Sequence, residues 1–344
     1  MKNIFGKALL MAAMAVFGLT SCSDDETVPQ TEPTYNMAGF AKGADVSWLT
    51  QMEASGTKFY DKNGSEKESM SLLREMGTNS IRLRIWVNPA DGWCGKDDLI
   101  AKAWRAKNLG YRLMVDFHYS DSWADPGKQP IPEAWKDHDI EAMKKAVADH
   151  TTDVLQTLKD RGIDVEWVQV GNETNTGMLW PVGQVVENDF TNFASLVTSG
   201  YDAAKAVYPD AKVVVHLSNG YDNSLFRWMF DGLTAKGAKF DTIGVSLYPE
   251  DSDWEEKTDQ CLTNLKDMAN RYGKEVMVCE FGMNWDSANS AAFATRLVEG
   301  CKGIDKCLGV FYWEPQCYNG WNGYTKGAFD DNGRPTSALD IYSK

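Results

Sequence analysis

Two short apolar runs, each carrying a glutamate at its end, give the clearest chemical signal in this sequence. One run is Trp167–Glu173 and the other is Val276–Gly282, which contains Glu280. A carboxylate at the end of a buried strand costs free energy unless it is paired or used. Two such carboxylates facing one pocket could cleave a glycosidic bond. The sequence therefore predicts a carboxylate pair formed by Glu173 and Glu280.

The sequence around these glutamates alternates strand-like apolar runs with helix-like segments, most of which stop at or near a glycine. The expected strands are Phe40–Ser47, Ser80–Trp86, Arg112–His118, Glu166–Gly171, Lys212–Leu217, Thr242–Leu247, Glu275–Glu280 and Gly309–Trp313. The expected helices are Glu66–Met76, Asp97–Leu109, Ile140–Arg161, Asp189–Tyr208, Asn223–Ala235, Trp254–Tyr272 and Ser287–Glu299. This alternation predicts an α/β fold, the (β/α)8 TIM barrel. An open doubly wound sheet competes, but no glycine-rich phosphate loop follows the first strand.

In a barrel of this kind, functional side chains lie where the strands end and the following loops begin. Glu173 and Glu280 would end the fourth and seventh strands and face each other across the mouth of the barrel. A barrel without a binding site has no need of polar or aromatic residues at every strand end. The residues expected to bind substrate at this rim are Asp45, Arg84, Trp86, Asp116, His118, Trp123, Asn172, Tyr248 and Trp313.

Retaining glycoside hydrolysis needs two carboxyl groups about 5–5.5 Å apart, one acting as an acid and one as a nucleophile. We expect Glu280 to be the nucleophile, kept ionised by Arg84 and by a hydrogen bond from Tyr248. We expect Glu173 to be the acid, with a pKa that the neighbouring negative charge raises. Asn172 would form a hydrogen bond with the sugar 2-hydroxyl.

Each of these residues also has a structural alternative that the sequence leaves open. Glu173 follows Asn172 and could be an acid at a helix N-terminus, with Asn172 as the cap. Glu280 could form only a structural ion pair with Arg84. His118 could bind sugar hydroxyls, position a carboxylate or be a buried structural histidine. The tryptophans could belong to the core rather than to sugar platforms.

The composition narrows the classes of ligand. The net charge is −14, from 49 Asp and Glu against 35 Lys and Arg, which argues against nucleic acid and against a polyanionic glycan. Thirteen tryptophans and thirteen tyrosines suit a neutral sugar polymer, because aromatic rings pack on the apolar faces of sugars. The expected chemistry requires no cofactor or metal, although a structural calcium held by scattered loop oxygens stays open. We expect a monomer that binds polysaccharide.

The N-terminus has the pattern of a bacterial lipoprotein signal. Lys2 and Lys7 give it a positive start, and an apolar run, Ala8–Thr20, ends just before Cys22. We therefore expect residues 1–21 to be a signal peptide and Cys22 to be lipidated. An ordinary secretory signal that happens to contain a cysteine is the alternative.

The residues after this signal divide into a tether and a domain. Residues 22–38 are expected to form an acidic flexible linker, and residues 39–344 the catalytic domain. The acidic tract Ser23–Glu26 resembles the export signal of Bacteroidetes surface lipoproteins. We therefore expect an outer-membrane lipoprotein exposed at the cell surface and anchored through its lipid, since no later apolar run is long enough to span a bilayer.

Six cysteines remain once Cys22 is set aside, and an extracytoplasmic location permits disulfides among them. Six thiols allow 15 pairings, and the sequence does not choose among these. Cys279 lies within an expected strand and is predicted to be a buried free thiol. The cysteines are Cys94, Cys261, Cys279, Cys301, Cys307 and Cys317.

Several motifs together resemble glycoside hydrolase family 53, the arabinogalactan endo-β-1,4-galactanases. The motifs are Gly43–Ser47, Ser80–Pro89, Asp116–Gly127, Val168–Glu173 and Gly309–Pro315. The resemblance extends from about Phe40 to Phe329. It implies a retaining mechanism, with Glu173 as acid/base and Glu280 as nucleophile. It also implies an internal cut in the β-1,4-galactan of type I pectic arabinogalactan.

Two regions depart from the family pattern. The surroundings of Cys94 and Cys317 match no family motif, and the loop Asp251–Trp254 differs from the forms typical of the family. Because both flank the expected cleft, the number of sugar subsites and the product length stay open. Two other functions also stay open: an enzyme of the same clan acting on xylan, mannan or β-glucan, and a surface lipoprotein that binds glycan without cutting it.

Overall fold

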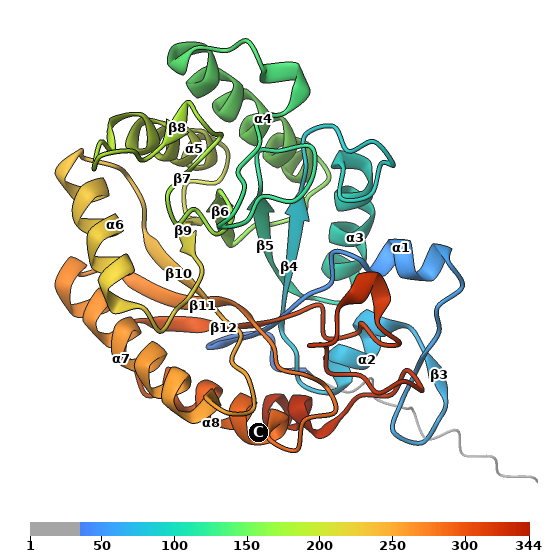
Figure 1. Ribbon diagram of the computed structural model, residues 1–344. Coiled ribbons are helices and arrows are strands. Elements are labelled where there is room, and N and C mark those ends of the chain that lie inside the picture. Colours follow the sequence, from blue (N-terminus) through green and yellow to red (C-terminus); the bar gives the residue numbers. More distant parts are fainter. Residues whose placement is uncertain (1–34) are drawn as a thin grey trace, which may run out of the picture. The chain divides into compact units, whose positions relative to one another are not determined.

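Eight parallel strands close into a ring at the centre of the structure (Figure 1). The computed structural model describes residues 35–344, so the predicted signal peptide, the lipidation site Cys22 and linker residues 22–34 lie outside the described residues. Around the ring the strand order is β1-β12-β11-β10-β9-β6-β5-β4, which confirms the predicted (β/α)8 barrel. The barrel strands are β1 (Ala41–Asp45), β4 (Ser80–Ile85), β5 (Arg112–Phe117), β6 (Trp167–Val170), β9 (Lys212–Leu217), β10 (Thr242–Leu247), β11 (Glu275–Phe281) and β12 (Cys307–Trp313).

Helices surround the ring of strands (Figure 1). Side chains alternate between the two faces of a strand, so every second residue of β4 points outward, and Ile81, Leu83 and Ile85 are buried in the main core. Within residues 35–344 no helix has the length and apolar character needed to cross a membrane. The helices are α1 (Leu49–Ala54), α2 (Ser69–Glu75), α3 (Lys96–Asn108), α4 (Ile140–Asp160), α5 (Thr191–Val207), α6 (Asn223–Ala235), α7 (Trp254–Tyr272) and α8 (Ser290–Lys302), with 3-10 turns at Glu133–Trp135, Trp321–Gly323 and Ser337–Ser343.

The segment predicted as a helix over 66–76 is divided in the structure. Its first two residues form β3 (Glu66–Lys67), which pairs antiparallel with β2 (Phe59–Tyr60), and helix α2 begins only at Ser69. The reason is local: the carboxylate of Glu68 accepts hydrogen bonds from the backbone N–H groups of the first helical turn at 3.0 and 2.7 Å and so caps the helix. A second short hairpin, β7 (Gly177–Met178) with β8 (Gly183–Gln184), lies in the loop between β6 and α5 and was not predicted.

The inside of the barrel has an apolar layer and a polar layer. The rings of Trp167 and Phe311 meet edge to face in the apolar layer, with centroids 5.9 Å apart. Gly43 must lack a side chain, because a Cβ there would lie 2.2 Å from the Phe311 ring. Inward-facing residues nearer the carboxyl ends of the strands are polar and include Asp45 and Arg82. The apolar layer consists of Ala41, Met114, Trp167, Val214, Met277, Cys279 and Phe311.

A bulge in β11 brings two consecutive residues into the barrel. Val245 of β10 pairs with Val278, but the next residue of β10 pairs with Glu280, so β11 contains one extra residue at this point. Cys279 joins the apolar layer and Glu280 still reaches the polar one. Gly244 of β10 makes room, since a Cβ there would lie 2.5 Å from the Cys279 sulfur. Bulges re-aim side chains in this way next to active sites.

All six cysteines of the described residues are free thiols, and five of them are buried. The prediction for Cys279, a buried thiol within a strand, is confirmed. None of the 15 pairings left open by the sequence is formed. The barrel is thus held by its packed layers and not by cross-links between these cysteines.

Candidate active site

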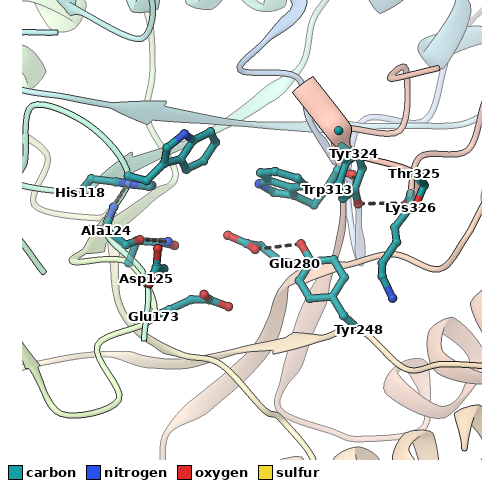
Figure 2. A pocket seen from close by; sticks show the side chains of 13 residues that line it. His118, Ala124, Asp125, Glu173, Tyr248, Glu280, Trp313, Tyr324, Thr325 and Lys326 are labelled. Carbon is teal, nitrogen blue, oxygen red and sulfur yellow. Dashed lines mark hydrogen bonds between the residues drawn. The ribbon is translucent and has the colours of Figure 1, made fainter. Parts of the chain in front are cut away.

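A cavity of about 390 Å³ opens at the carboxyl ends of the barrel strands and contains both predicted glutamates. Figure 2 shows the carboxyl groups of Glu173 and Glu280 directed toward the same space, with His118 and Asp125 on the side of Glu173 and Trp313 and Tyr324 on the other. The cavity is lined by His118, Trp123, Ala124, Asp125, Asn172, Glu173, Tyr248, Glu280, Trp313, Gly323, Tyr324, Thr325 and Lys326.

Glu173 lies in an irregular loop and not in a helix. It follows β6 by three residues and has a φ of 45°, a left-handed conformation that is uncommon for a residue with a side chain. Helix α5 begins only at Thr191, so the alternative of an acid at a helix N-terminus is wrong. Tyr119, Asn219 and Glu314 also follow barrel strands closely and have φ values of 51°, 54° and 47°. Backbone strain is thus concentrated at the rim that bears the glutamates, as is common at functional sites.

Glu280 is held by a guanidinium and a phenol. One carboxylate oxygen lies 2.9 Å from Nη2 of Arg82, and the other accepts the predicted hydrogen bond from Tyr248 at 2.9 Å. The prediction that Arg84 holds Glu280 is wrong. Both arginines face the barrel interior, but Nη1 of Arg84 lies 2.7 Å from a carboxylate oxygen of Glu314, and Arg82 spans the barrel to Glu280.

Arg82 is the centre of a buried ionic cluster. Its guanidinium lies 2.6 Å from the carboxylate of Asp45 and 2.9 Å from that of Asp116, and both aspartates have no exposed surface. The carboxamide oxygen of Gln169 accepts two further hydrogen bonds, at 3.2 and 3.0 Å. Asp45 and Asp116 were predicted to bind substrate. The structure instead buries them beneath the cavity, where they hold Arg82 in place.

Asn172 and His118 line the cavity and are themselves fixed by neighbours. The amide nitrogen of Asn172 donates to the carbonyl of Ala124 at 2.9 Å, and its oxygen accepts from Arg82 at 3.1 Å. Nδ1 of His118 accepts from the indole of Trp86 and from the backbone of Ala124, both at 3.3 Å, so its proton lies on Nε2, 3.0 Å from Asp116. His118 therefore positions a carboxylate, one of the three roles left open by the sequence.

A second cavity of about 600 Å³ adjoins the first. The predicted binding residues Trp123 and Trp313 line both cavities, and Trp86 lines the second. Because four residues are shared, the two cavities are neighbouring compartments of one cleft. The second compartment is lined by Trp48, Gln51, Trp86, Asp91, Trp93, Cys94, Trp123, Trp313, Asn322, Gly323 and Tyr324.

Burial raises the pKa of both glutamates of the pair. Desolvation is the largest cause for Glu173, whose pKa rises to about 7, and the negative charges of Asp125 and Asp116 add to it. Desolvation also raises the pKa of Glu280, to about 8; Arg82 opposes this rise and the charge of Glu173 adds to it. The two carboxyl groups therefore hold a shared proton more readily than isolated carboxyl groups would.

Several residues of the site were missed in the sequence. Arg82 carried a signal, because it lies two residues before Arg84 and must face the same side of the strand. Asp125, Tyr324 and Lys326 lie in loops, where no periodic pattern indicates which side chains turn toward the cavity. In the described part of the chain, no group of three or more His, Cys, Asp or Glu side chains could hold a metal ion.

Known proteins resemble this chain in sequence and in fold. An uncharacterized protein of Niallia circulans is 40% identical over 252 residues, which cover 72% of this chain and 68% of that protein. The arabinogalactan endo-β-1,4-galactanase of Humicola insolens is 34% identical over 333 residues, which cover 88% and 98% of the two chains. A structure from a study of two fungal β-1,4-galactanases superposes with a TM-score of 0.82 at 30% identity, covering 89% of this chain and 100% of the other. Residues 41–296 match the model of glycosyl hydrolase family 53, and the chain therefore belongs to that family of glycoside hydrolases.

Proposed function

We propose that this glycoside hydrolase cuts internal β-1,4-galactosidic bonds of galactan and type I arabinogalactan with retention of configuration. The observation that carries the proposal is the pair Glu173 and Glu280 in one cavity, of which only Glu280 contacts a guanidinium and a phenol. The names of the relatives from Humicola insolens and of the fungal structures support galactan as the substrate. The two compartments of the cleft support an internal cut, because together they have room for sugar units of the glycan chain beyond the bond that is cleaved.

The contacts of the two glutamates support different protonation states. Burial raises the pKa of both carboxyl groups, so their contacts decide which one keeps the proton. Arg82 and Tyr248 both stabilise a negative charge on Glu280, so Glu280 would be ionised and Glu173 would keep the proton. The carboxylate of Glu280 would attack the anomeric carbon while Glu173 gives its proton to the leaving oxygen. The charge on Glu280 disappears in the resulting ester, the pKa of Glu173 falls, and Glu173 can then take a proton from water, which hydrolyses the ester.

The substrate is tested by measuring reducing sugar released from potato galactan, xylan, mannan and β-glucan in parallel. We expect release from galactan far above that from the others. Release mainly from xylan, mannan or β-glucan would favour the alternative of another activity of the same clan. Binding of galactan without any release would favour the alternative of a non-catalytic glycan-binding protein. Short oligosaccharides appearing early, rather than galactose alone, would establish internal cutting.

We also propose that residues 39–344 are the catalytic domain of a monomeric outer-membrane lipoprotein, anchored at Cys22 and exposed at the cell surface. The sequence pattern of residues 1–26 supports this location. In the bacterial host, a fatty-acid label should be incorporated by the wild type and not by C22S, and added protease should remove the protein from intact cells. A soluble periplasmic wild-type protein without label would contradict the proposal. Size-exclusion chromatography tests the monomer.

A further inference from the structure

Arg84 is a buried cation with an unusual set of neighbours. Its side chain is 1% exposed, and its one carboxylate partner within residues 35–344 is Glu314, at 2.7 Å. Glu314 in turn accepts a hydrogen bond from the backbone N–H of Trp48 at 3.0 Å and one from the amide of Gln316 at 2.7 Å. The ion pair therefore joins strand β4, the end of β12 and the start of α1. None of these contacts involves Glu173 or Glu280.

Four tryptophan rings surround the guanidinium of Arg84. Its central carbon lies 5.0, 5.6, 4.4 and 5.9 Å from the ring centroids of Trp48, Trp86, Trp123 and Trp313. Within residues 35–344, the nitrogens Nε and Nη2 of Arg84 have no hydrogen-bond partner, although both are buried. These two N–H donors therefore face the aromatic rings. A cation above an aromatic ring is attracted to the electrons of the ring face.

The same four rings form a wall of the second compartment. They also touch one another edge to face: Trp48 lies 5.5 Å from Trp123 and 5.1 Å from Trp313, and Trp86 lies 5.3 Å from Trp123. A ring in such a cluster cannot turn without disturbing its neighbours. Arg84 is the one buried charge that all four rings share among the described residues, so its guanidinium favours one arrangement of the wall over others.

We propose that Arg84, fixed by Glu314, is a positioning residue that orients the tryptophan wall and so sets the affinity for the sugar units that occupy the second compartment. This inference rests on the proposed galactanase function. It separates the roles of the two arginines of β4: Arg82 holds the nucleophile, and Arg84 holds the surface on which the rest of the glycan chain packs. Arg84 itself is buried and need not touch the substrate.

The test compares the wild type with R84M and R84K on β-1,4-galacto-oligosaccharides of increasing length. For R84M we expect kcat/KM on the longest oligosaccharides to fall about tenfold through KM, with a much smaller fall on the shortest ones that are cleaved. R84K should show a smaller loss in kcat/KM than R84M, because lysine keeps the positive charge but lacks the planar guanidinium group. Binding to the E280Q background, measured by calorimetry, should show the same length dependence without any turnover.

R112M is the matched control. Arg112 also stacks on a tryptophan, with its central carbon 4.6 Å from the Trp167 ring, and also pairs with a glutamate, Glu166, but it lies at the opposite end of the barrel. R112M should leave the length dependence unchanged. An equal loss on all lengths in R84M, or a loss in kcat alone, would overturn the inference. If R84M does not fold, the length dependence measured for R84K decides. A wild type that is inactive on galactan would instead refute the proposed function.

Discussion

Two arginines of strand β4, Arg82 and Arg84, face the same interior yet occupy opposite kinds of environment. Arg82 contacts three carboxylates, of Asp45, Asp116 and Glu280. Arg84 contacts one carboxylate and four aromatic rings. The first environment is an excess of negative charge around one cation, and the second is a cation in a mostly apolar enclosure.

The difference explains how one strand can serve both the chemistry and the binding of a long substrate. Around Arg82 the surplus of carboxylates keeps the local field negative, which favours a proton on the nearby Glu173. Around Arg84, the carboxylate of Glu314 contacts the guanidinium and neutralises its charge, and the four rings gain a fixed neighbour. Changes near Arg82 should therefore affect the reaction, whereas changes near Arg84 should affect the affinity for the chain.

The largest effects should come from the glutamates that define the ionic region. Replacing Glu173 by Gln removes the acid and should lower kcat on galactan by about 10²–10⁴-fold, the usual contribution of a positioned acid. E280Q removes the nucleophile and should cost at least as much. NMR of the anomer formed first by the wild type should show retention. Near wild-type activity in either variant, or inversion in the wild type, would contradict the assigned roles.

Arg82→Met is the sharpest test of the contrast between the two arginines. It leaves three buried carboxylates without their cation, so we expect a loss of about 3–5 kcal/mol in the free energy of unfolding. R84M leaves only the carboxylate of Glu314 without its cation. Burial already raises the pKa of Glu314 to about 7, so this group can take up a proton and avoid a buried, unpaired charge. In urea denaturation at pH 6, the free energy of unfolding should therefore be largest for the wild type, smaller for R84M and smallest for R82M. The reverse order of the two variants would show that the aromatic enclosure matters more to stability.

Tyr248→Phe should have a smaller effect, confined to the reaction. The variant removes one hydrogen bond, 2.9 Å long, to the Glu280 carboxylate and keeps the ring. A hydrogen bond to a charged group contributes about 1.5–3 kcal/mol, so kcat/KM should fall about 10- to 100-fold. Loss of this donor also raises the pKa of Glu280, so the acidic limb of the pH–rate profile should move to higher pH. A lower activity with an unmoved acidic limb would mean that Tyr248 acts on the sugar and not on Glu280.

The barrel was predictable from the sequence for a physical reason. Strand alternation and glycine stops are local patterns, and they indicated each of the eight barrel strands. The same alternation puts Arg82 and Arg84 on one face, but it does not show which of them reaches Glu280, and the prediction wrongly named Arg84. That choice depends on the bulge at Cys279 and on how far each side chain extends across the barrel. The residues that form the walls of the cleft were harder to predict, because Trp93 and Tyr324 come from loops that meet only in the folded chain.

The pH dependence of stability isolates the ionic region. Folding raises the pKa of Glu173 from 4.5 to about 7, so between these values the folded state binds more protons than the unfolded state. The contribution of Glu173 to stability is therefore complete below pH 4.5 and is lost as the pH rises through about 7. E173Q cannot titrate at this position, so the free energy of unfolding of the wild type minus that of E173Q should decrease over this interval. Chemical denaturation of both proteins at several pH values measures this difference. A difference that grows with pH would mean that Glu173 is ionised in the folded protein, and Glu280 would then have to be the protonated partner.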